Sequence, residues 1–216
     1  MMPIHSKPSL LLKERAYQYI REAILKETFL PGEILSERRL IDCLGMSKTP
    51  IKSALDRLEV EGFVRVASKQ GIVVNELSVE KARDIFELRM ALELFVCELV
   101  SGRLKKGEIA LIEQNLELQR RAVAAEDDLA FTEADSEFHI LLVRFSGNAE
   151  IHSVMTMYQA HLYRSVIKVI RRVPNRMEAA YLDHWQMFKS LVEGDVEHAK
   201  RLVRDHLHFG RAILTD

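Results

Sequence analysis

The sequence predicts a mainly α-helical fold, with a winged helix-turn-helix at the amino-terminal end and an all-α bundle of six or seven helices behind it. Two observations lead to this prediction. In residues 1–76, short helical patterns precede two β-prone runs, which is the order of elements in a winged helix. From residue 78 to residue 214, apolar residues recur almost continuously at helical spacing, and few prolines or glycines interrupt them. We therefore expect two domains, residues 1–76 and residues 77–216.

The composition fits this division. A chain of 216 residues that is 48% hydrophobic can form one or two domains with a substantial core. The formal net charge is -1, but residues 1–76 hold 12 Lys and Arg against 10 Asp and Glu, whereas residues 77–216 hold 19 against 22. The basic excess lies on the helix-turn-helix side and is too small to indicate a nucleic-acid partner by itself.

Cysteine content and hydropathy indicate a cytoplasmic protein. Cys43 and Cys97 are the only cysteines; they are too few and too far apart for a disulfide framework, so we expect both to be small buried residues in a reducing cytosol. No segment approaches the ~20 apolar residues of a membrane span, and the amino-terminal end has no apolar stretch long enough for export. We therefore expect no membrane partner.

Three helices and a hairpin are expected in the first domain. The first helix covers Leu10 to Thr28 and ends before Pro31-Gly32. The second begins with Ser36 as its N-cap and stops at Gly45. The third opens at Ser47, keeps Pro50 within its first turn, where proline is tolerated, and ends near Gly62. The β-prone runs 63–67 and 71–74, joined by residues 68–70, then predict the hairpin of the wing.

Helix-breaking residues divide the second domain into about six helices of ordinary length. The breaks lie at Lys106-Gly107, at residues 126–128, at residues 146–148, at Pro174 and at Gly194-Asp195. Asn148, which follows Gly147, is expected to be a helix N-cap rather than a ligand group.

The start of the third helix carries the side chains expected of a DNA-reading helix. Such a helix needs polar groups near its amino-terminal end to reach base edges and phosphates. Lys48 and Lys52 stand one helical turn apart and share a face. The polar residues at this end are Ser47, Lys48, Thr49 and Lys52.

These segments resemble the amino-terminal domain of the GntR family of bacterial transcription regulators. The shared motifs are Pro-Gly-x-x-Leu from Pro31, Ser-x-Thr-Pro-x-x-x-Ala-Leu from Ser47 and Leu-x-x-x-Gly ending at Gly62. The resemblance implies that the DNA contacts come from Arg38, Lys48, Thr49 and Lys52, and that Gly71 at the wing tip lies against the minor groove. The family commonly has arginine at positions 48 and 52, and lysine lacks the planar fork that reads guanine, so the base preference stays open.

A carboxylate and an imidazole share one face of a helix in the second domain. Asp135 and His139 are four residues apart, and their apolar neighbours, such as Phe131 and Phe138, indicate that this helix is packed. A carboxylate in a packed bundle is costly unless a positive charge compensates for it. A metal ion would do so.

This segment also resembles the FadR C-terminal-domain subfamily of ligand-binding domains. The resemblance implies a divalent metal held by Asp135, His139, His184 and His206. A single straight helix would separate the last two by about 33 Å, but Gly194-Asp195 offers a turn that brings them together. Three imidazoles and one carboxylate suit zinc, nickel, iron(II) or manganese, and this ligand set alone does not choose among them. Zinc is the first expectation. The other histidines match no ligand position: His5, His152, His161, His198 and His208.

Arg89 is the candidate effector-binding residue. It matches an arginine that the subfamily points into the bundle, where it could clamp a small carboxylate held at an open metal position. An ion pair with Glu93, one helical turn away, is an equally good interpretation.

Together these features predict a DNA-binding transcription regulator, not an enzyme, whose operator affinity depends on a small carboxylate at the metal. We expect a homodimer on a short inverted repeat, because two-fold proteins match palindromic sites. A metal-responsive regulator is the first alternative. A metal-dependent hydrolase is less favoured because no paired general base, nucleophile motif or phosphate loop is present. An acyl-CoA-responsive regulator is also less favoured, because the acyl-CoA-responsive branch of the subfamily does not use this set of metal ligands.

Overall fold

The structure, a computed structural model, describes residues 8–67, 71–76 and 78–215. The expected wing-tip turn at residues 68–70 and His5 lie outside the described residues. The chain divides into two compact units, Met1–Glu76 and Leu77–Asp216.

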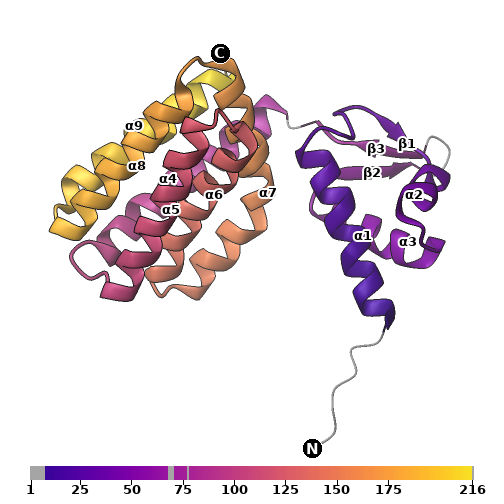
Figure 1. The fold of residues 1–216 in the computed structure, drawn as a ribbon, viewed down its shortest axis with the longest axis horizontal. Helices are drawn as coiled ribbons and strands as arrows, with labels where there is room; N and C mark the ends of the chain where they lie inside the picture. Colours follow the sequence, from indigo (N-terminus) through magenta and orange to yellow (C-terminus); the bar gives the residue numbers. More distant parts are fainter. Residues whose placement is uncertain (1–7, 68–70, 77, 216) are drawn as a thin grey trace, which may run out of the picture. The chain divides into compact units, whose positions relative to one another are not determined.

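In its described residues, 8–67 and 71–76, the amino-terminal unit has three helices and a small antiparallel sheet (Figure 1). Its elements are α1 (Pro8–Leu25), β1 (Ile34–Leu35), α2 (Glu37–Leu44), α3 (Lys48–Val60), β2 (Val64–Ala67) and β3 (Gly71–Val74). The sheet order is β1-β3-β2, with Leu35 opposite Ile72 and Val64 opposite Val74. The predicted winged helix is confirmed, and β1 is an addition to it. A strand of two residues is too short to show the alternation of apolar and polar residues by which a strand is recognised in a sequence.

Local capping chemistry sets where α2 begins and ends. The Ser36 hydroxyl accepts a hydrogen bond from the backbone N–H of Arg39 at the start of α2. Gly45 ends α2 in the left-handed conformation, with φ 60°. Both caps are as the sequence predicted. Ser47 precedes α3 in extended conformation, although its side chain makes no capping bond. The helices pack through buried side chains that include Ile20, Leu40, Ile51 and Leu58.

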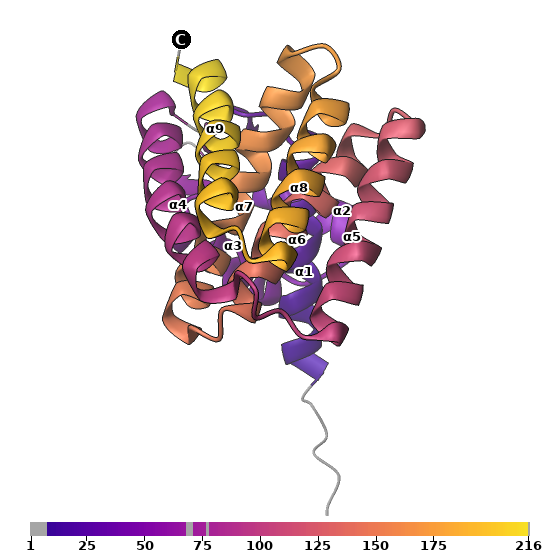
Figure 2. The ribbon, with the colours of Figure 1, turned by 90° about the vertical axis from the view of Figure 1, so that its left-hand side faces the viewer.

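The described part of the carboxyl-terminal unit, residues 78–215, is a bundle of six helices (Figure 2). They are α4 (Val79–Val100), α5 (Lys106–Ala124), α6 (Asp128–Phe145), α7 (Ala149–Arg172), α8 (Arg176–Glu193) and α9 (Val196–Thr215). The expected break at Lys106-Gly107 is wrong, because both residues lie in the first turn of α5 and the preceding connection is residues 101–105. The other breaks separate the observed helices. The Asn148 side chain caps α7 by accepting hydrogen bonds from the backbone N–H groups of Glu150 and Ile151.

Helix α6 is the central helix of the bundle. It packs against α4, α5, α7 and α8, and residues around its circumference are buried, with Phe131, Phe138 and Val143 fully enclosed. Burying each phenylalanine contributes about 1.5–3 kcal/mol. Because α6 is enclosed on several sides, polar residues on it are held in the interior as well.

The two cysteines differ in environment. Cys97 is buried in the bundle core, but Cys43 is exposed, so the expectation that both are buried is wrong for Cys43. The reason is that α2 is short and buries only Leu40. Within the described part of the chain, no helix combines the length and apolar character that crossing a membrane requires.

Candidate functional site

Four buried side chains from three helices meet inside the bundle. Asp135 and His139 come from α6, His184 from α8 and His206 from α9, and one ligand atom from each lies within 4.8 Å of the others. Helices α8 and α9 pack against each other after the chain reverses at Gly194, whose φ of 83° is left-handed. The structure therefore brings together all four residues that the sequence singled out.

Each imidazole is held through its Nδ1 atom by a different partner. His139 Nδ1 lies 2.7 Å from Glu93 Oε2, and His184 Nδ1 lies 2.8 Å from Gln119 Oε1. His206 Nδ1 lies 3.0 Å from Asp183 Oδ2. At His139 and His184 the partner is an oxygen acceptor, so Nδ1 carries the hydrogen and Nε2 keeps its lone pair. His206 Nδ1 lies between an acceptor, Asp183 Oδ2, and a donor, Arg176 Nη2 at 3.2 Å, and the shorter contact with Asp183 favours the same tautomer.

The remaining donor atoms face one another. His184 Nε2 lies 3.4 Å from His206 Nε2 and 3.7 Å from Asp135 Oδ1. His139 Nε2 and Asp135 Oδ2 have no hydrogen-bond partner within the part of the chain that the structure describes. Leaving such a buried group unsatisfied costs about 1–3 kcal/mol. Lone pairs on three nitrogens and a carboxylate, gathered in this way, fit a divalent cation.

Burial sets the protonation states that such a cation needs. It lowers the pKa of His184 well below its ordinary value, and the nearby His206 and His139 lower it further. Burial also lowers the pKa of His139 and of His206, so the imidazoles are neutral, as metal ligands must be. Burial raises the pKa of Asp135, and a bound cation would favour its ionised form.

The groups that orient the histidines include two that the sequence motifs do not reveal. Gln119 is fully buried and donates to Asn115 Oδ1 at 2.8 Å. Asp183 directly precedes His184 in the sequence. The sequence signal that could have identified Gln119 is a polar residue at an interior-facing position of α5. Its partner, His184, can be identified only when the packing of α5 on α8 is known.

Arg89 makes the expected ion pair and also lines a cavity. It is buried, and its Nε atom donates to Glu93, so the ion pair is present. Arg89 also lines a cavity beside the cluster, together with Asp135, His206 and a second buried arginine, Arg176. Burial would raise the pKa of Glu93, but the guanidinium charge of Arg89 and the hydrogen bonds from His139 and Arg89 outweigh it and lower that pKa to about 2.

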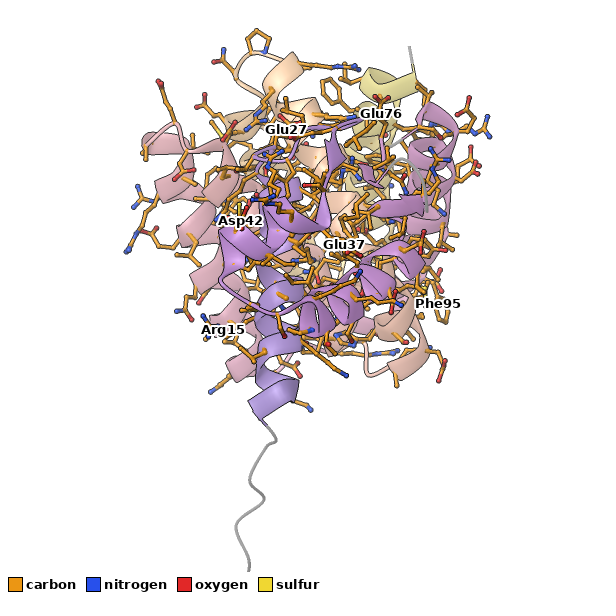
Figure 3. All side chains as sticks on the ribbon, turned by 90° about the vertical axis from the view of Figure 1, so that its right-hand side faces the viewer. Arg15, Glu27, Glu37, Asp42, Glu76 and Phe95 are labelled. Atoms are coloured by element: carbon orange, nitrogen blue, oxygen red, sulfur yellow. The ribbon has the colours of Figure 1, made fainter. Side chains whose placement is uncertain are left out.

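The candidate DNA-reading residues lie on the surface of the helix-turn-helix. Lys48 pairs with Glu37 of α2, its Nζ lying 2.7 Å from a carboxylate oxygen, and Arg38 lies 4.0 Å from Asp42. Figure 3 labels the two acidic partners, Glu37 and Asp42. The exposed side chains at the start of α2 and α3 include Arg38, Ser47, Lys48, Thr49 and Lys52. The surface therefore presents these groups to solvent, as a DNA-reading helix must.

Gly71 has a structural role within the wing. Its φ is 99°, and a Cβ atom there would lie 2.8 Å from the backbone oxygen of Leu35. A side chain at this position would therefore collide with β1 as well as strain the backbone.

Family comparisons agree with this architecture. Residues 12–74 match the family of bacterial regulatory proteins called gntR, and residues 84–209 match the FCD domain. The chain belongs to the GntR family and carries an FCD domain. In this GntR regulator the helix-turn-helix implies DNA binding, and the FCD domain implies effector binding.

Named relatives are regulators as well. An uncharacterised HTH-type transcriptional regulator from an unstable DNA locus of Streptomyces ambofaciens is 30% identical over 204 residues, covering 93% of this chain and 82% of the relative. The transcriptional repressor RspR of Escherichia coli is 24% identical over 200 residues, covering 93% and 87%. The structure of E. coli McbR/YncC has the same fold, with a TM-score of 0.80 and 20% identity over 94% of this chain and 96% of that one.

These similarities decide between regulator and enzyme. The family and the named relatives are transcription regulators, so this GntR regulator is not a metal-dependent hydrolase. The cavity and the histidine cluster then belong to a regulatory domain.

Proposed function

We propose that this regulator binds a short inverted repeat in duplex DNA as a homodimer, and that a small carboxylate bound at a divalent metal in the FCD domain controls its operator affinity. The convergence of Asp135, His139, His184 and His206 carries the proposal. Two copies are expected because one recognition helix reads too few base pairs for useful specificity, and a two-fold protein matches an inverted repeat.

The metal would be held by the Nε2 atoms of the three histidines and a carboxylate oxygen of Asp135. This donor set suits zinc first, with nickel, manganese and iron also compatible. When bound, the ion would supply positive charge and open coordination positions for an anionic ligand. The partners at Nδ1 support this assignment, because metal-binding histidines commonly donate their other N–H to a carboxylate or carbonyl oxygen.

The arginines beside the cluster favour a carboxylate as effector. Arg89 and Arg176 line the same cavity as Asp135 and His206, and a guanidinium can hold a carboxylate through two parallel hydrogen bonds. The other lining residues are mainly apolar, including Phe86, Val169 and Ile170. A small ligand with an anionic end therefore fits the chemistry of this cavity.

The small size of the cavity links effector binding to a change in operator affinity. Its free volume is about 20 Å³, which is room for roughly one water molecule. A carboxylate must therefore displace side chains or shift helices as it enters, and it favours a packing of the bundle different from the one described here. Such couplings are typically about 1–3 kcal/mol, a roughly 5- to 150-fold change in operator affinity.

A metal-responsive regulator is the second candidate, and the small cavity is the observation that favours it. In that case the ion itself is the signal, and no organic ligand enters.

Metal analysis combined with DNA binding tests the proposal. The purified protein is analysed for bound metals, stripped with a chelator and reloaded with zinc. Its affinity for an operator selected from random duplexes is then measured in the stripped, zinc-loaded and zinc-plus-carboxylate states. We expect about one metal per chain and an affinity that changes when a panel of small carboxylates is added. A response to zinc alone would favour the second candidate, and protein that binds no divalent metal would refute both.

A further inference from the structure

Glu93 joins the candidate metal centre to the candidate effector site. It is 4% exposed on α4. Its Oε2 atom accepts from His139 Nδ1 at 2.7 Å, and its Oε1 atom accepts from Arg89 Nε. One carboxylate therefore holds a metal-ligand histidine and a cavity-lining arginine at the same time.

Asp183 also joins a histidine of the cluster to an arginine that lines the cavity. Its Oδ2 atom lies 3.0 Å from His206 Nδ1 and 3.3 Å from both terminal nitrogens of Arg176. Two histidine–carboxylate–arginine chains are thus present, and in the second one Arg176 Nη2 also lies 3.2 Å from His206 Nδ1 itself. The third histidine differs, because the neutral side chain of Gln119 holds His184 and is itself held by Asn115.

A carboxylate in this position has opposite effects on its two neighbours. Toward the histidine, it fixes the tautomer and raises the basicity of the Nε2 atom, which strengthens metal binding. Toward the arginine, it occupies guanidinium N–H groups and neutralises their charge, so an incoming anion must share the arginine with it.

We propose that Glu93 and Asp183 are positioning residues that strengthen metal binding through His139 and His206 while restraining Arg89 and Arg176 from binding an anion. This inference rests on the proposed function and deepens it. Anion affinity is then set by competition inside the protein as well as by the metal, and an effector must be anionic enough to draw at least one arginine away from its carboxylate.

The test is a pair of isosteric variants, Glu93→Gln and Asp183→Asn. Glu98→Gln is the matched control: Glu98 lies on α4 like Glu93, but it pairs with Lys200 at the protein surface. Cobalt(II) affinity is measured by competition with a chelator. Acetate affinity is then measured on protein saturated with cobalt(II), from the change in the cobalt absorption spectrum.

We expect each site variant to bind cobalt(II) about 10- to 100-fold more weakly and to bind acetate several-fold more tightly. The control should change neither quantity. Weaker cobalt(II) binding together with tighter acetate binding is the distinguishing result, because general damage to the fold would weaken the binding of both ligands. Gln119→Leu provides a contrast, since it should weaken cobalt(II) binding without tightening acetate binding.

The outcomes separate the two proposals. Wild-type protein that binds no cobalt(II) would remove the metal centre and this inference with it. Wild-type binding with equal cobalt(II) affinity in both site variants, or weaker acetate binding in them, would overturn the inference alone. If Glu93→Gln does not fold because Arg89 loses its buried partner, Asp183→Asn decides the matter, since the Asp183 side chain is 36% exposed.

Discussion

Lys48 at the start of the predicted DNA-reading helix is paired with Glu37 of the preceding helix, with 2.7 Å between the ammonium nitrogen and a carboxylate oxygen. Both side chains are largely exposed, at 64% and 45%. Exposed pairs of this kind contribute about 0–1 kcal/mol. A DNA phosphate can therefore replace Glu37 as the partner of Lys48 at little cost.

Lys48→Ala should weaken operator binding and leave the fold intact, because the side chain is exposed. If Lys48 contacts one phosphate, the slope of log affinity against log salt should fall by about one unit. Fluorescence anisotropy over a range of salt concentrations measures both effects. Lys189→Ala, an exposed lysine on α8, is the control, and an unchanged operator affinity in Lys48→Ala would exclude this residue as a contact.

Glu37→Gln should have the opposite effect. It removes the competing partner of Lys48 and a negative charge at the proposed DNA-binding surface, so operator binding should tighten several-fold at low salt. The same anisotropy titration measures the gain, which should shrink as salt is added because the effect is electrostatic. Weaker binding would mean that Glu37 holds Lys48 in its DNA-binding position.

His206→Ala should lower metal occupancy and abolish the effector response, while basal DNA binding persists. It removes one of four proposed ligands. His208→Ala is the matched control, because His208 lies on the same helix but is exposed. Metal content per chain and operator affinity with and without carboxylate are the measurements. Full occupancy and a normal response in a variant that lacks both His184 and His206 would return these residues to a packing role.

Gly71→Ala should destabilise the winged helix by about 1–3 kcal/mol, because it combines an unfavourable φ with a close approach to β1. Gly107→Ala is the control: it lies in the first turn of α5, and no atom lies within 4 Å of its added Cβ. That change should be neutral or stabilising by up to about 1 kcal/mol. Urea unfolding followed by circular dichroism compares the two, and equal midpoints would contradict the expectation.

The two thiols should react differently. Burial raises the pKa of Cys97 to about 12, so this thiol is both inaccessible and protonated at mildly alkaline pH. Cys43 is exposed. A colorimetric thiol reagent should therefore modify one cysteine per chain in the native protein and two in denaturant. Cys43→Ser, which should abolish the rapid reaction, identifies the residue.

Features that depend on neighbouring residues could be predicted from the sequence. Ser36 and Gly45 bound α2, and Asn148 caps α7, because caps are made within one helical turn. The cluster of ligands was predicted because Asp135 and His139 are one turn apart and a family resemblance supplied the other two. The turn at Gly194 makes their meeting possible.

The partners of the histidines could not be predicted in this way. Glu93 and His139 are 46 residues apart, and Gln119 and His184 are 65 apart. Those contacts depend on how α4 and α5 pack against α6 and α8, which the periodicity of a single helix does not specify. The exposure of Cys43 has the same origin, since it depends on which side of a two-turn helix faces its neighbours.

The position of Asp135 and His139 on α6, the enclosed helix of the bundle, has a consequence for the amount of protein in the cell. An ion held there would cross-link α6 to α8 and α9, and it would bind the folded domain but not the unfolded chain. At 100 times its dissociation constant, a ligand of this kind adds about 2.7 kcal/mol to the free energy of unfolding. Metal shortage would then expose the regulator to proteolysis, and its abundance would follow metal supply independently of any effector.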